Sequence, residues 1–82
     1  MRKAFGQYVV VDAKICHGRP TFAGTRILVS DVLEQVADGA DWKLIEEQWR
    51  GAINQDAIAE AVLFARQALL EHVPQLPEPS QA

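Results

Sequence analysis

Residues that carry redox, metal or membrane chemistry are scarce in these 82 residues. The single cysteine, Cys16, cannot form a disulfide within the chain, so we expect a protein of the reducing cytosol. The candidate ligands Asp12, Cys16, His17 and His72 do not match the spacing of known metal sites, so we expect neither a metal nor another cofactor. No apolar stretch approaches the roughly 18 residues of a transmembrane helix, which predicts a soluble, unexported chain with no membrane contact.

Groups for catalysis are also few. Cys16 and His17 are adjacent, and neighbours in a strand point to opposite faces, which disfavours a thiolate–imidazole pair. The segment from Gly18 to Gly24 lacks the Lys-Ser/Thr pair of a phosphate-binding loop. The sequence therefore predicts no enzyme and no small-molecule substrate. The alternative is a small enzyme that uses Cys16 or His17.

The hydrophobic content of 49% predicts a folded core, and the length allows one small domain. A domain of this size buries only roughly 60% of its unfolded surface, so its stability is marginal and a homodimer is expected to enlarge the core. We predict a flexible arm over residues 1–7, one domain over 8–73, and a mobile proline-rich tail over 74–82.

Three short segments rich in aromatic and β-branched residues predict strands: Tyr8–Val11, Pro20–Phe22 and Thr25–Val29. Three helices are expected after them, each with a polar N-cap and a glycine or proline stop. The caps and stops are Ser30 and Gly39, Asp41 and Gly51, and Asn54 and Pro74. The predicted fold is α+β, a short N-terminal β-hairpin or small sheet followed by a helix-turn-helix (winged-helix-like) arrangement of three helices.

The third helix is more apolar than one buried face requires. Its predicted core stripe is Ile58, Ala61, Val62, Ala65, Ala68 and Leu69. At 100° per residue, Leu63, Phe64 and Leu70 lie roughly 120–140° away from Ile58. These three residues and Leu76 in the tail are the candidate contacts with a partner or a second copy. The alternative is that the sheet wraps around the helix and covers them.

Charge is divided unevenly along a chain of net charge −3. The first thirty residues hold five basic residues and one acid, whereas residues 31–82 hold three basic residues and ten acids. This split predicts two faces with different partners, or two copies meeting through opposite charges; ordinary solvated surfaces are the alternative. The candidate DNA contacts are the five basic residues and two amides at the start of the third helix: Arg2, Lys3, Lys14, Arg19, Arg26, Asn54 and Gln55. The nearby acids Asp56 and Glu60 would repel phosphates.

Several motifs resemble a small prokaryotic family, the domain-of-unknown-function family number 433. They are Gly18-Arg19-Pro20, Gly24-Thr25-Arg26-Ile27, the segment Ala37–Ala40, the aromatic Trp49, and the alanine-rich segment Glu60–Ala65. The likeness covers roughly residues 8 to 70. Relatives often place a proline and a leucine after the aromatic residue, whereas Arg50-Gly51 stands here, so the turn between the second and third helices is expected to differ.

The resemblance implies a winged-helix or homeodomain-like domain that acts as an antitoxin of a type II toxin–antitoxin pair. Such antitoxins bind and silence a toxin resembling the PIN-type ribonucleases, and commonly repress their own operon through DNA. The matching Arg26 is expected to bond an acid such as Asp31 or to hold its turn, with DNA contact as the alternative. A dimeric protein-interaction module without nucleic-acid binding is the alternative function.

Overall fold

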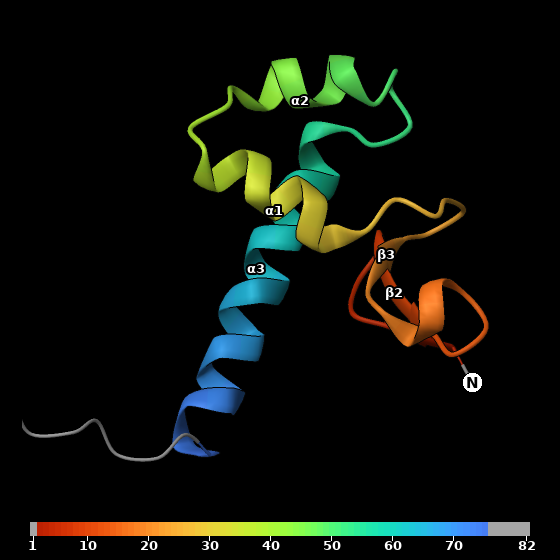
Figure 1. Ribbon diagram of the computed structural model, residues 1–82, viewed down its shortest axis with the longest axis vertical. Helices are drawn as coiled ribbons and strands as arrows, with labels where there is room; N and C mark the ends of the chain where they lie inside the picture. Colours follow the sequence, from red (N-terminus) through yellow and green to blue (C-terminus); the bar gives the residue numbers. More distant parts are fainter. Residues whose placement is uncertain (1, 76–82) are drawn as a thin grey trace, which may run out of the picture.

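A three-stranded antiparallel sheet precedes three helices, so the chain has the predicted α+β fold (Figure 1). The structure is a computed structural model and describes residues 2–75. The tail beyond Gln75, including Leu76, lies outside the described residues. The elements are β1 (Arg2–Ala4), β2 (Val9–Asp12), the 3₁₀ turn η1 (Cys16–Gly18), β3 (Thr21–Phe22), α1 (Val29–Ala37), α2 (Trp42–Gln48), α3 (Gln55–His72) and the 3₁₀ turn η2 (Val73–Gln75).

The sheet has the order β1-β2-β3 and corrects the expected flexible arm. Arg2 pairs with Asp12 and Ala4 with Val10, so part of the predicted arm is an edge strand. Its residues are exposed and mostly polar, which hid the strand from a search for apolar, β-branched runs. On the other side of β2, Val9 pairs with Phe22.

The strand predicted over Thr25–Val29 is wrong. Only one isolated bridge, between Thr21 and Leu28, forms where a hairpin was expected. The Thr25 side chain holds the segment in a turn instead: its hydroxyl donates to the Phe22 carbonyl at 2.8 Å and accepts the Ile27 N–H at 3.0 Å. Such local side-chain bonds compete with a strand ladder.

Helix α1 starts earlier than predicted. Its N-cap is Leu28, so Ser30 lies inside the first turn and its prediction as the cap is wrong. The end of α1 is as predicted, because Gly39 has a φ of 84° and donates to the Val36 carbonyl at 3.0 Å. Ala40 then donates to the Gln35 carbonyl at 3.1 Å, which completes a Schellman motif.

The predicted caps of α2 and α3 are confirmed. The Asp41 side chain accepts the Lys43 N–H, and the Asn54 side chain accepts the Ala57 N–H at 2.8 Å. Between the helices, Arg50 and Gly51 both have a positive φ, of 56° and 75°, and the Arg50 N–H donates to the Glu47 carbonyl at 3.0 Å. The turn that ends α2 therefore begins at Arg50, one residue before the predicted Gly51.

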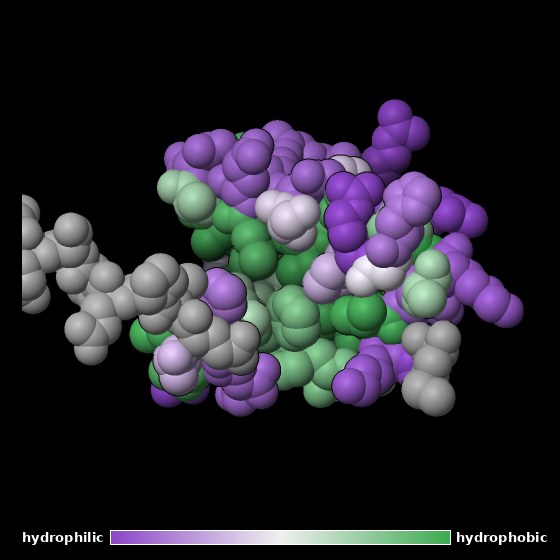
Figure 2. Space-filling model, turned by 60° about the horizontal axis from the view of Figure 1, so that its bottom comes forward, coloured by the Kyte–Doolittle hydropathy of each residue, from purple (hydrophilic) through white to green (hydrophobic). Residues whose placement is uncertain are grey.

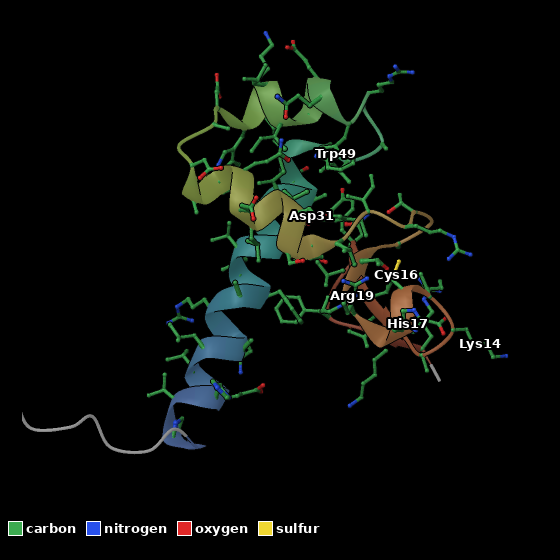
Figure 3. The ribbon with its side chains drawn as sticks, viewed as in Figure 1. Lys14, Cys16, His17, Arg19, Asp31 and Trp49 are labelled. Atoms are coloured by element: carbon green, nitrogen blue, oxygen red, sulfur yellow. The ribbon has the colours of Figure 1, made fainter. Side chains whose placement is uncertain are left out.

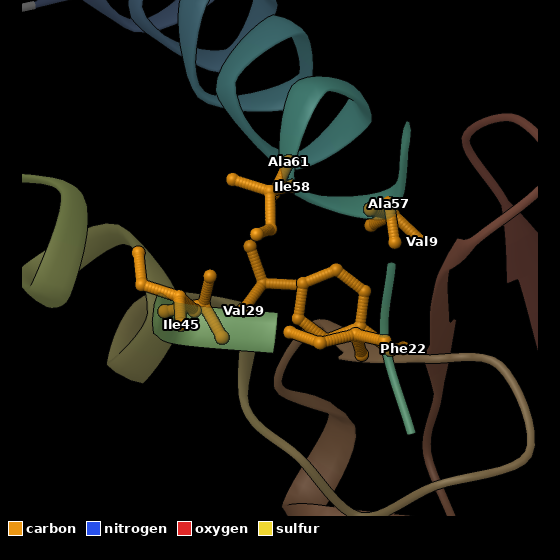
Figure 4. Packing of buried hydrophobic residues seen from close by; sticks show 9 residues of the cluster. Val9, Phe22, Val29, Ile45, Ala57, Ile58 and Ala61 are labelled. Carbon is orange, nitrogen blue, oxygen red and sulfur yellow. The ribbon is translucent and has the colours of Figure 1, made fainter. Parts of the chain in front are cut away.

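The core lies where the sheet, α1, α2 and the first half of α3 meet (Figure 4). Val9 and Phe22 come from the sheet, and Ile45 and Ile58 come from α2 and α3. The other buried members are Val29, Val32, Ile53, Ala57 and Ala61. At the edge of the core, the Trp49 indole donates to the Gln35 side-chain oxygen at 2.8 Å, which ties the end of α2 to α1.

Candidate interaction surfaces

Helix α3 leaves the core halfway along its length (Figure 1). Its buried residues are Ala57, Ile58 and Ala61, whereas every residue from Arg66 to His72 is exposed. The predicted core stripe is therefore wrong at Ala68 and Leu69, because neither the sheet nor another helix extends far enough to cover them. Burial could not be predicted from periodicity alone, since periodicity does not reveal where the neighbouring elements end.

Four large aliphatic side chains stand exposed on and beside this half of α3. Leu63 is 57% exposed, Leu69 57%, Leu70 53% and Val73 50%. Figure 2, which brings this end of the molecule forward, shows hydrophobic groups at the surface among polar ones. We call these four residues the α3 apolar face. Leu63 and Leu70 were predicted as partner contacts, and both lie on it.

Phe64 lies differently from the other predicted partner contacts. Its ring meets the ring of Phe5 edge to face, with centroids 5.2 Å apart, and it packs against the core. It is only partly exposed, because the loop between β1 and β2 covers it. The structure thus assigns Phe64 to contact within the chain and leaves Leu63 and Leu70 at the surface.

Glu60 binds the loop between β1 and β2. This contact was not predicted from the sequence. Its Oε1 accepts the Gln7 N–H at 2.7 Å, and its Oε2 accepts the N–H groups of Tyr8 at 2.7 Å and Val9 at 2.6 Å. The carboxylate therefore ties the hairpin to α3 one turn before Phe64. The approach is close, since a Cβ at Gly6 would lie 2.5 Å from Glu60 Oε1.

The five predicted cationic contacts are all exposed and surround the sheet and η1. We call this set the basic end: Arg2, Lys3, Lys14, Arg19 and Arg26. Figure 3 shows Lys14 and Arg19 beside η1 and Asp31 apart from them on α1. Within residues 2–75, Arg26 forms no ion pair with Asp31, so that expected bond is wrong.

The turn η1 shapes this end of the molecule. Cys16 and His17 adopt left-handed conformations, with φ of 50° and 59°, rather than the strand assumed for them. Arg19 Nε donates to the Cys16 carbonyl at 3.2 Å, and the Cys16 thiol donates to the Arg26 carbonyl at 3.7 Å. The Nε group of Arg19 thus stabilises the turn η1. Beside it lies an open hollow of about 250 Å³ lined by Ile15, Gly24, Thr25 and Arg26.

The two amides predicted to contact DNA are engaged within the chain. Asn54 caps α3, and its Nδ2 lies 3.5 Å from the Tyr8 hydroxyl. Gln55 Nε2 donates to Glu46 Oε1 at 3.4 Å. Both side chains would have to give up these bonds to read bases. The N-terminus of α3 is therefore a poorer candidate for a DNA contact than the basic end.

The family described as "Protein of unknown function (DUF433)" matches residues 9–65. The chain belongs to this family. The DUF433 match covers β2, β3, α1, α2 and the buried half of α3, and it ends where α3 leaves the core; β1 lies before it. Neither the curated proteins nor the solved structures contain a match. Within residues 2–75, no helix combines the length and hydropathy needed to cross a membrane.

Proposed function

We propose that this protein is the non-catalytic antitoxin of a type II toxin–antitoxin pair and that it neutralises a PIN-like ribonuclease in the cytoplasm. The observation that carries the proposal is the α3 apolar face, which the chain presents outside its own core. Leucine side chains more than half exposed on one helix are typical of a helix that docks into a partner. The family resemblance supplies the identity of that partner.

The test is co-expression with the product of the adjacent gene. We expect that product alone to arrest growth and the wild-type pair to grow and co-purify. The double variant Leu63→Glu/Leu70→Glu should lose both rescue and co-purification, because two carboxylates replace apolar contacts. Leu44→Glu is the matched control, since Leu44 is 47% exposed on α2, away from this face. The proposal would be rejected if the product of the adjacent gene did not arrest growth, or if the double variant still rescued growth.

The basic end supports a second component of the function, repression of the antitoxin's own operon through DNA. Five exposed cations without a carboxylate partner in residues 2–75 form a surface suited to phosphates. In this proposal the sheet and η1, rather than α3, approach the DNA backbone. The two components are separable, because the α3 apolar face and the basic end lie on different elements.

A dimeric protein-interaction module without nucleic-acid binding is the second candidate. The observation that favours it is the engagement of Asn54 and Gln55 inside the chain, next to the acid Asp56. Salt titration separates the candidates: affinity for duplex DNA should fall steeply with salt if phosphates are bound, whereas an apolar interface changes little.

A further inference from the structure

One charged residue, Arg66, lies among the four residues of the α3 apolar face, and its position restricts the partner. At 100° per residue, the four apolar residues span an arc of roughly 120°, with Leu69 at one edge and Leu63 at the other. Arg66 falls near the middle of this arc. Along the axis it lies one turn after Leu63 and one turn before Leu70. Any surface that covers the face therefore covers Arg66.

Within residues 2–75, no carboxylate pairs with Arg66. Arg66 is exposed and forms no ion pair within residues 2–75. Glu71 lies roughly 140° around the helix from Arg66 and accepts a hydrogen bond from Gln67 at 3.2 Å. The face consequently offers aliphatic side chains around a guanidinium that has no acidic partner in the part of the chain that the structure describes.

We infer that the α3 apolar face binds a partner surface on which aliphatic side chains surround one carboxylate, placed to meet Arg66. Withdrawing a guanidinium from water costs free energy unless a carboxylate pairs with it, and an arginine–carboxylate pair can be bidentate. The inference deepens the proposed function, on which it rests, by naming the chemistry of the toxin surface that this face recognises.

A second copy fits the same face poorly. When two such faces meet, both guanidinium groups are desolvated, and neither face supplies an acid. This holds for parallel and antiparallel contacts, because the arc from Leu69 to Leu63 contains no Asp or Glu. A homodimer, which the small core still favours, is expected to use another surface.

The experiment uses the full chain and two synthetic helical peptides. Both peptides carry a leucine face; one has a single glutamate at its centre, and the other has lysine there. We expect the wild-type chain to bind the glutamate peptide about tenfold more tightly, on the scale of a close interfacial charge pair. Arg66→Glu should reverse the preference. Lys43→Glu is the matched control, since Lys43 is exposed on α2, and should leave both affinities unchanged.

Equal affinities for the two peptides, or an Arg66→Glu variant that keeps the original preference, would overturn the inference. Sedimentation is an independent test of the inference. If the wild-type chain is a dimer and Leu70→Glu dissociates it, a second copy of the chain occupies the face and the inference is wrong. Failure of the proposed function remains distinguishable, because the peptides do not involve the adjacent gene product. If Arg66→Glu still neutralises that product while Leu63→Glu/Leu70→Glu does not, the inference fails and the antitoxin function stands.

Discussion

At the scale of single residues, Glu60 shows how one side chain can fix the position of an element. Its carboxylate accepts three consecutive backbone N–H groups of the loop that precedes β2. Hydrogen bonds to an ionised acceptor are stronger than neutral ones, and these three join parts of the chain more than fifty residues apart. The carboxylate, rather than mere polarity at this position, is what the loop requires.

Replacement of this carboxylate should therefore destabilise the fold. In Glu60→Gln, the amide nitrogen cannot accept a hydrogen bond, so at least one N–H of the loop loses its acceptor. We expect the free energy of unfolding to fall by about 2 kcal/mol, measured by urea denaturation. Glu47→Gln, at an exposed position of α2, is the control and should unfold like the wild type. Matching midpoints for the two variants would contradict the role assigned to Glu60.

At the scale of secondary-structure elements, the features that depend on neighbouring residues were the predictable ones. Asp41, Asn54 and Gly39 act through bonds to residues a few positions away, so their roles are visible in the local sequence. The contact of Glu60 with Val9 spans 51 positions, and no local pattern reveals it. The strand over Thr25–Val29 was predicted wrongly because its β-branched content suits a strand, whereas the Thr25 hydroxyl stabilises a turn.

The turn between α2 and α3 offers a test of backbone strain. Arg50 occupies a left-handed conformation that costs a residue with a Cβ about 1–2 kcal/mol. Arg50→Gly should remove that cost, in part offset by the greater chain entropy of glycine in the unfolded state, for a net gain of about 0.5–1 kcal/mol. Thermal unfolding measures the change.

The same replacement inside a helix should act in the opposite direction. Arg66→Gly lies within α3, where glycine costs about 1 kcal/mol relative to a good helix former. Arg50→Gly without any stabilisation would argue that the left-handed turn does not persist in solution.

At the scale of the whole molecule, the charge split predicted from the sequence acquires a location. The basic end surrounds the sheet and η1, whereas most acids lie on the helices. The sequence could reveal the imbalance but not that Asn54 and Gln55 would be engaged within the chain. Cations near in sequence are near in space here because the first thirty residues form one compact hairpin region.

Binding to duplex DNA should follow this distribution of charge. We expect the logarithm of the affinity to fall linearly with the logarithm of salt concentration, with a slope of about −0.9 for each phosphate contacted. Lys14→Glu should weaken binding and make the slope shallower, as measured by fluorescence anisotropy. Lys43→Glu reverses a charge on α2 and should change neither quantity. Equal effects of the two variants would exclude the basic end as the contact surface.

Because α3 projects beyond the core, the residues needed for folding and the residues available for recognition lie on different halves of the helix. Residues such as Ile58 and Ala61 cannot change without loss of packing, whereas Leu63, Arg66 and Leu70 contribute little to the folding of their own chain. Mutation in this second group can alter which surface is recognised while the scaffold persists. Related proteins could thus diverge in specificity through a few substitutions on one helix, with the rest of the domain conserved.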